Sequence, residues 1–193
     1  MAKKNIILAL TGASGAGYGL AALNILGRLT DYQIHLIISS QGKKMLKQEC
    51  EWESSTLPEN CQVYDNNKLD TPLASGSFAC EGMIIAPSSL HTAMSIGAGL
   101  ANNLILRAGQ VCLKEKRKLV LVLRETPLAA IHLERLAQLS RDGAVVMPAA
   151  PGFYNHPVNI HDLFEQISSR AVSFLVPDKG LVDTYIPRSG KSL

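Results

Sequence analysis

The sequence predicts an α/β fold with a single doubly wound, mostly parallel sheet and helices on both faces. Short continuous apolar runs, typical of strands buried on both faces, alternate with longer amphipathic segments. The chain has 193 residues, 47% hydrophobic and 18% charged, which is enough apolar material for one buried core. Small, hydroxyl-bearing or charged residues follow most of the runs directly. This arrangement is typical of parallel strands that end at one edge of a sheet, where ligands bind.

The apolar runs give the expected strands, in chain order 6–10, 34–38, a weaker run at 61–64, 83–86, 119–123 and 144–147. The expected helices lie between or after them, at 17–29, 41–50, 90–115 with a break near 97–102, 127–141 and 160–175. Thr126 followed by Pro127 predicts an N-cap and a first-turn proline, and Asn159 predicts the N-cap of the last helix. The composition of 65–79 predicts a long loop. We expect one domain over residues 1–175 and a C-terminal tail over 176–193.

Charge and cysteine content exclude several classes of protein. The formal net charge is +3, and the basic residues are scattered apart from 114–118, so we expect no nucleic-acid partner. The four cysteines lie far apart without a CxxC pair, which favours a reduced, cytoplasmic protein over a zinc or disulfide framework. The first apolar run is shorter than the core of a secretory signal, and no run approaches the roughly 20 residues of a membrane helix. We therefore expect no membrane partner.

The glycine-rich loop 12–19 follows the first strand and opens the first helix. Such a loop can present backbone N–H groups and a helix N-terminus to a phosphate. A P-loop would continue with Lys and then Ser or Thr, whereas Tyr18 follows Gly17. A dinucleotide site prefers an acidic residue at the end of the second strand, where Ser39 stands. A mononucleotide such as FMN fits better, with glycines that only allow tight helix packing as the alternative.

Two pairs of charged residues are further candidates. Arg124 and Glu125 directly follow the fifth strand, at the lip of the expected crevice. A carboxylate beside a cation stays ionised there and remains available for proton transfer, so we favour a functional role over a structural ion pair. Arg107 lies seven residues before Lys114 and so shares its helix face.

Arg170 stands at helical spacing with three apolar residues, Leu163, Ile167 and Phe174, on the stripe that we expect to face the core. It either meets an anion there or extends past the stripe to solvent.

The histidines give mixed signals. His91, close behind a pair of serines at a helix start, is well placed for ligand contact, whereas His132 and Glu134 fit the polar side of an amphipathic helix. The other histidines form no metal-ligand spacing, and no Asp-rich motif for Mg²⁺ is present, so we expect no metal.

Five motifs, in this order along the chain, resemble those of the flavin prenyltransferases, the UbiX family. They are TGASG at 11–15, PLASGS at 72–77, PSS at 87–89 with NNLI at 102–105 and Arg107-Ala108, RETPL at 124–128 with IHL at 131–133, and PAAPGFY at 148–154. The resemblance extends from about residue 5 to 175. It implies a Rossmann-like or flavodoxin-like, FMN-binding domain.

The resemblance also implies an activity. Members of the family are metal-independent transferases that join the dimethylallyl group of dimethylallyl phosphate to N5 and then C6 of reduced FMN. The product, prenylated FMN, serves a UbiD-type decarboxylase. The resemblance further implies a homo-oligomer, a dodecamer, whose subunits share the walls of their active sites.

The family's site residues carry over by position. The implied cofactor-binding residues are Gly12, Ala13, Ser14, Ser39, Ser89, Leu90, His91, Thr92, Arg107 and Arg124. The implied substrate-binding residues are Lys114, Arg124, Glu125, Tyr154 and Arg170, and the implied catalytic residues are Ser14, Glu49, Lys114 and Glu125. The chain departs from some relatives where Ser189 follows Pro187-Arg188 in place of an aromatic residue. Tyr185 or a neighbouring subunit are the candidates to replace that aromatic residue.

Two alternatives remain at this stage. One is an FMN-dependent decarboxylase of cysteine-containing substrates, whose Pro-x-Met-Asn segment is missing from this sequence. The other is a non-catalytic FMN-binding partner of a decarboxylase.

Overall fold

The computed structural model of the chain describes residues 3–52 and 57–177. Six parallel strands form one sheet in the order β3-β2-β1-β4-β5-β6. The chain adds β2 and β3 on one side of β1 and then β4, β5 and β6 on the other side, so the strand order reverses between β1 and β4. This confirms the predicted doubly wound fold. The strands are β1 (Lys4–Leu10), β2 (Tyr32–Ile38), β3 (Cys61–Asp65), β4 (Gly82–Ser88), β5 (Lys118–Leu123) and β6 (Ala144–Pro148).

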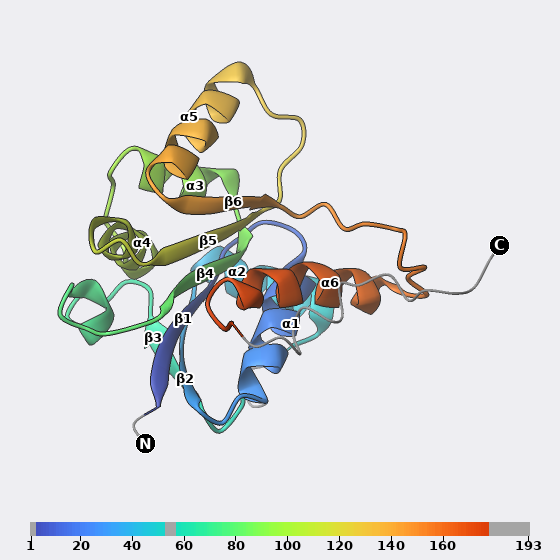
Figure 1. Ribbon diagram of the computed structural model, residues 1–193, viewed down its shortest axis with the longest axis horizontal. Helices are drawn as coiled ribbons and strands as arrows, with labels where there is room; N and C mark the ends of the chain where they lie inside the picture. The colour runs from blue at the N-terminus through green and yellow to red at the C-terminus, as the bar shows by residue number, and fades with distance from the viewer. Residues whose placement is uncertain (1–2, 53–56, 178–193) are drawn as a thin grey trace.

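Helices cover both faces of the sheet (Figure 1). The helices α1 (Ala16–Gly27), α2 (Ser40–Cys50) and α6 (Ile160–Ser173) pack on one face. The other face carries α3 (Leu90–Gly97), α4 (Leu104–Lys114), α5 (Ala130–Arg141) and the 3₁₀ turn η2 (Pro72–Ala74). The expected tail lies outside the described residues from 178 onward, and with it Tyr185 and Ser189.

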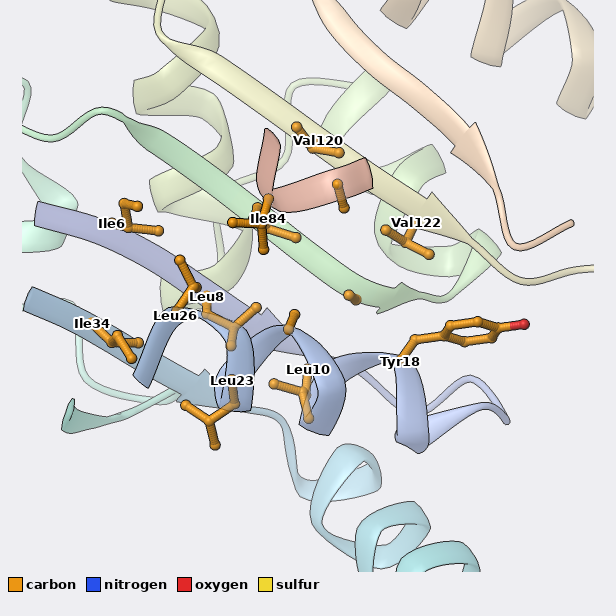
Figure 2. Close-up of a cluster of buried hydrophobic side chains, with 14 of the residues drawn as sticks. Ile6, Leu8, Leu10, Tyr18, Leu23, Leu26, Ile34, Ile84, Val120 and Val122 are labelled. Atoms are coloured by element: carbon orange, nitrogen blue, oxygen red, sulfur yellow. The ribbon is translucent and has the colours of Figure 1, made fainter. Parts of the chain in front are cut away.

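Strand β1 shows why its apolar run is continuous rather than alternating. Ile6, Leu8 and Leu10 pack into the core cluster under α1 and α6, where Figure 2 shows them beside Leu23 and Leu26. Ile7 and Ala9, which point the other way, pack into the cluster under α3 and α4. A central parallel strand buries both of its faces, so every position from Ile6 to Leu10 is apolar.

The helix boundaries differ most from the sequence prediction at the start of α5, and α1 and α6 each end two residues earlier than expected. The expected break near 97–102 is real, because α3 ends at Gly97 and Asn103 caps α4. Asn159 caps α6 as predicted. However, the prediction that Thr126 and Pro127 start α5 is wrong, since that helix begins at Ala130. His132 Nδ1 accepts the backbone N–H of Ala129, the N-cap residue, at 3.2 Å and so stabilises the first turn of α5.

Candidate active site

The loop 11–15 between β1 and α1 is held in place by Thr11. This side chain is 4% exposed. Its hydroxyl donates to the carbonyl oxygen of Pro87 at 2.7 Å and accepts the N–H of Ser89 at 2.8 Å. Thr11 therefore joins the ends of β1 and β4 at the point where the strand order reverses. Sequence reasoning missed this role, because a threonine at a strand end gives no sign of its partner 76 residues away.

A cavity of about 500 Å³ opens on one side of this loop, and we call it the switch-point pocket. It is lined by residues that follow β1, β2, β3 and β4 and by the start of α4, among them Thr11, Gly12, Ser39, Ser89, His91 and Thr92. The structure thus brings together many of the predicted cofactor residues.

The switch-point pocket is suited to an anion. Ser39 caps α2, with its Oγ accepting the N–H of Gly42 at 3.0 Å, and Ser89 caps α3, with its Oγ accepting the N–H of Thr92 at 3.2 Å. The first N–H groups of a helix have no partner inside that helix and carry the positive end of its dipole. Two such helix starts at one cavity favour a phosphate group.

The start of α4 lies at the same pocket but is already occupied by protein groups. Asn66 accepts the N–H of Leu104 with its carbonyl oxygen at 2.8 Å and that of Ile105 with its Oδ1 at 3.0 Å. Asn103 Oδ1 accepts the N–H of Leu106 at 3.0 Å. Asn66, which the sequence marked only as part of a turn, therefore fixes α4 against the pocket.

A second cavity, of about 820 Å³, lies beside the same loop, and we call it the Glu49 pocket. Its lining includes Ser14, Glu49 and Arg124 together with residues of α1 and α6. Glu49 Oε2 accepts the N–H groups of Gly15 and Ala16, both at 2.8 Å, and Arg124 Nε donates to the carbonyl oxygen of Ser14 at 3.1 Å. A carboxylate and a guanidinium thus meet at the N-terminus of α1.

Glu49 is held as a carboxylate. Partial burial by itself raises the pKa of this carboxyl group. Hydrogen bonds from Ser14, Ala16 and Gly15, together with the positive charge of Arg124, outweigh burial and bring the pKa below its ordinary value. Only the resemblance had pointed to Glu49, since it lies 33 residues from Ala16 in the sequence.

Two glycines give the Glu49 pocket its shape. Gly15 has a φ of 96°, which favours glycine, and turns the chain into α1. A Cβ on Gly17 would lie 2.2 Å from the ring of Phe164, so the glycine is what lets α6 approach α1. Phe164 also meets Tyr18 edge to face, with ring centroids 4.9 Å apart.

A third cavity, of about 690 Å³, is lined by Arg107 and Lys114 of α4 and by the segment around η2. Arg107 Nε donates to the carbonyl oxygen of Ala74 at 3.0 Å, and Lys114 forms an ion pair with Glu115 at 2.9 Å. The prediction that Arg107 and Lys114 share a helix face is confirmed. This cavity and the Glu49 pocket have no lining residue in common.

The remaining predicted substrate residues line none of these three cavities. Glu125 is exposed, and its Oε1 accepts the N–H of Thr126 at 3.1 Å. Tyr154 is 48% exposed, in the segment between β6 and α6. The side chain of Ala13 is buried, so this residue offers a ligand only its backbone groups, whereas that of Leu90 is partly buried against the core.

Of the two outcomes considered for Arg170, the position facing the core is wrong, and the structure shows the alternative, extension to solvent. Its side chain is exposed, and the guanidinium lies over the ring of Phe174, 4.6 Å from the centroid. The buried face of α6 includes Ser168, Ser169 and Ala171 instead, because these small residues allow close packing on α1. Ser168 Oγ donates to the carbonyl oxygen of Tyr18 in α1 at 2.7 Å. No carboxylate of residues 3–52 and 57–177 lies within ion-pair distance of Arg170.

Comparisons with known proteins identify the family. The chain matches the Flavoprotein family over residues 1–178. It is 44% identical, over 83% of its length and 86% of the relative's, to the flavin prenyltransferase LpdB of Lactiplantibacillus plantarum. It is also 38% identical, over 97% of its length and 95% of the relative's, to the flavin prenyltransferase UbiX of Pseudomonas aeruginosa.

Solved structures agree with the sequence relatives. AnUbiX (PadA1), crystallised with FMN and dimethylallyl pyrophosphate, has a TM-score of 0.89 and 36% identity, covering 98% of this chain and 100% of that one. A PPC decarboxylase, at 16% identity and a TM-score of 0.60, shares only the fold. This chain belongs to the Flavoprotein family and, within it, to the flavin prenyltransferases.

Proposed function

We propose that this enzyme joins the dimethylallyl group of dimethylallyl phosphate to N5 and then C6 of reduced FMN and releases prenylated FMN. One observation carries the proposal. A pocket suited to a phosphate and a carboxylate–guanidinium pair suited to proton transfer flank the same short loop, residues 11–15.

The switch-point pocket fits the phosphate end of FMN. The hydroxyls of Ser39 and Ser89 accept helix N–H groups and can still donate their own protons to phosphate oxygens. The first amides of α2 and α3 add donors without any net charge. Loop 12–14 connects this pocket to the Glu49 pocket, since Gly12 lines the first and Ser14 and Arg124 line the second, so this loop and Arg124 would hold the flavin between the two. When bound and reduced, the flavin supplies the nucleophilic ring atoms.

Glu49 is the group that we expect to move protons. It is ionised, the Ser14 side chain and the Arg124 guanidinium both lower its pKa, and all three residues line one pocket. A carboxylate linked to a hydroxyl can take a proton through that hydroxyl and return it later in the reaction. Ser14 would therefore pass a proton between Glu49 and a bound ligand, whereas Glu125 lies outside the Glu49 pocket.

The prenyl phosphate requires cations. An allylic carbon gains positive charge as its phosphate leaves, and fixed cations stabilise the departing anion. Lys114, Arg170 and the hydroxyl of Tyr154 are the proposed donors to this phosphate, with Glu125 beside them. In one protomer these side chains do not converge on the Glu49 pocket, so we propose that neighbouring subunits bring some of them to it.

Exposed apolar residues support an assembly of this kind. Phe153 is 70% exposed, Val158 91% and Ile160 59%, all in or next to the segment that carries Tyr154. A cluster of exposed apolar side chains is typical of a protein interface. A UbiX-like decarboxylase from Escherichia coli O157:H7, with a TM-score of 0.83 and 34% identity over 98% of this chain and 100% of that one, is a dodecamer. We propose the same closed homo-oligomer here.

The destination of the product is also part of the proposal. We propose that a UbiD-type decarboxylase receives the prenylated FMN. All four cysteines are free thiols, which agrees with a reducing, cytoplasmic location. Among the described residues no helix combines the length and the apolar character needed to cross a membrane.

A direct test uses the purified, assembled protein without oxygen. Reduced FMN and dimethylallyl phosphate are added together, and the flavins are extracted and analysed by mass spectrometry. We expect a new flavin carrying one five-carbon unit, which forms from reduced but not from oxidised FMN. Unchanged FMN after binding of both ligands would support the non-catalytic alternative. Flavin-dependent oxidation of a cysteine-containing peptide would support the decarboxylase alternative.

A further inference from the structure

Two of the four cysteines form a pair outside all three cavities. Cys80 immediately precedes the segment that leads into β4, and Cys112 lies in the last turn of α4. Cys112 is fully buried, Cys80 is half-buried, and both pack against the same core cluster. Both cysteines contact Arg117, and their thiols lie close enough for each to shift the pKa of the other.

Arg117 completes this cluster. Its backbone N–H donates to the carbonyl oxygen of Cys112 at 2.8 Å. Its guanidinium donates to the carbonyl oxygens of Phe78 at 2.7 Å and Gly76 at 2.6 Å and lies 3.9 Å from Cys80 Sγ. The positive charge is therefore fixed beside one sulfur of the pair.

The four cysteines differ in acidity. A hydrogen bond from the Cys112 thiol and the nearby Arg117 guanidinium lower the pKa of Cys80 to about 7, against the opposing effect of burial. The pKa of Cys112 is raised, because its thiol is bonded to Cys80 and buried. Burial raises the pKa of Cys61 to about 11 and also raises that of Cys50. Only the thiolate is a nucleophile, so Cys80 stands apart from the other three.

We propose that Cys80 and Cys112 form a peroxide-sensitive thiol pair, in which Cys80 is the attacking sulfur and Cys112 the resolving one. The Cys80 thiolate attacks one oxygen of a hydroperoxide such as hydrogen peroxide, the O–O bond breaks, and the leaving hydroxide takes a proton to become water. The Cys112 thiol then displaces the hydroxyl group of the Cys80 sulfenic acid. A disulfide and a second water result, with two thiols oxidised and one peroxide reduced.

The disulfide would act on a segment that matters for the third cavity. Residues up to Cys80 include Ala74 and Gly76, whose carbonyl oxygens bind Arg107 and Arg117 of the neighbouring helix region. A covalent bond from Cys80 to Cys112 would fix the end of this segment to α4, the helix that carries Lys114. Oxidation therefore reaches a cavity lined by two of the proposed site residues.

The test uses the full chain in its native assembly. The protein is reduced, freed of reductant, exposed briefly to hydrogen peroxide, blocked with N-ethylmaleimide and digested without reductant for mass spectrometry. We expect a peptide pair joined through Cys80 and Cys112, lighter by two hydrogen atoms than the two reduced peptides, while Cys50 and Cys61 carry the blocking group. Before oxidation, iodoacetamide at pH 7 should label Cys80 about tenfold or more faster than Cys61.

Variants separate the two sulfurs. Cys112→Ser, with Cys112→Ala as a second variant should the first not fold, should leave Cys80 as a sulfenic acid that dimedone traps. Cys61→Ser is the matched control and should form the Cys80–Cys112 link like the unaltered protein. Finding Cys80 and Cys112 both blocked after peroxide treatment, or Cys80 joined to a cysteine of another chain, would overturn the proposal. Because the readout is a peptide mass, it is independent of whether the enzyme transfers a prenyl group.

Discussion

The two halves of the sheet's carboxyl edge are built differently. Around the ends of β1, β2 and β4, the predicted ligand-binding groups are tied together by short hydrogen bonds, as Thr11, Ser39 and Ser89 illustrate. In the chain that follows β5 and β6, Glu125, Tyr154 and Arg170 are exposed. The first half, which we assign to the flavin, is preorganised within one chain. The second half, which we assign to the prenyl donor, needs another surface to complete it.

The largest effect should come from the preorganised half. Glu49→Gln keeps the shape and the hydrogen bonds to Gly15 and Ala16 but cannot take up a proton. We expect turnover to fall by about 10²-fold or more, the usual range for a lost general acid or base. FMN affinity should change little. Stopped assays with mass spectrometric detection, together with an FMN titration, measure both quantities.

A matched control for this variant is Glu51→Gln, which removes an exposed carboxylate two residues away at the C-cap of α2. It should keep normal turnover. Equal losses in the two variants would mean that general negative charge, and not proton transfer at the Glu49 pocket, explains the effect.

In the second half, which we assign to the prenyl donor, a substitution should change the affinity for the donor and not the turnover. Arg170→Ala removes a guanidinium that we assign to the prenyl phosphate, a charge-assisted contact worth about 1.5–3 kcal/mol. The apparent affinity for dimethylallyl phosphate should fall about 10- to 100-fold by the same estimate, with flavin affinity nearly unchanged. Kinetics against donor concentration measure it, with Arg135→Ala on α5 as an exposed control. If Arg170 only packs on Phe174, donor affinity will not move.

Mixing these two variants tests whether the halves come from different chains. When Glu49→Gln and Arg170→Ala subunits are co-expressed, a site shared between chains receives one intact half from each about a quarter of the time. At a dimethylallyl phosphate concentration well below the KM of the unaltered enzyme, where each variant alone is nearly inactive, we expect activity to recover to roughly that fraction of the unaltered enzyme. A site contained within one chain would leave every site damaged, and the mixture would then be no more active than the average of its two components.

The difference between local signals and contacts of distant residues explains which features could be predicted from the sequence. The strands, the break between α3 and α4, and the Asn159 cap rest on local signals, namely continuous apolar runs and capping residues a few positions apart. The contacts of Glu49 and Thr11 span 33 to 78 residues, and no local pattern encodes them. The predicted burial of Arg170 was wrong for a related reason. Helical spacing placed it among apolar residues, but the contact with α1 selects which side of α6 is buried.

Ser39→Ala should have a smaller effect within the preorganised half. Loss of the N-cap of α2 costs about 1 kcal/mol of folding free energy. Loss of one hydroxyl donor, worth about 0.5–1.5 kcal/mol, should weaken FMN binding about two- to tenfold. Urea unfolding and an FMN titration separate the two losses. Ser140→Ala, at an exposed position of α5 outside the pocket, is the control and should alter neither quantity by as much.

The smallest effect should be on the pH dependence of stability, through His35. This residue lies in β2, the strand that leads to Ser39 in the preorganised half. His35 is 5% exposed, its Nδ1 lies 3.0 Å from the hydroxyl of Tyr64, and its Nε2 lies 2.9 Å from Oδ1 of Asn5. Since Asn5 Nδ2 donates to the carbonyl oxygen of Ala79, Asn5 Oδ1 is the acceptor for an Nε2–H, and a neutral ring satisfies both neighbours. Burial lowers the pKa of His35 below its ordinary value.

A histidine with a lowered pKa binds fewer protons when folded than when unfolded. Its contribution to stability is therefore fully present above the unfolded pKa of about 6.5 and is lost as the pH falls from there toward the folded pKa. We expect the thermal unfolding midpoint of the unaltered protein to fall as the pH is lowered through this window. In His35→Gln the midpoint should be lower at pH 7 but should depend less on pH, whereas His156→Gln, at an exposed site, should keep the full dependence. An unchanged pH dependence in His35→Gln would place the titrating group elsewhere.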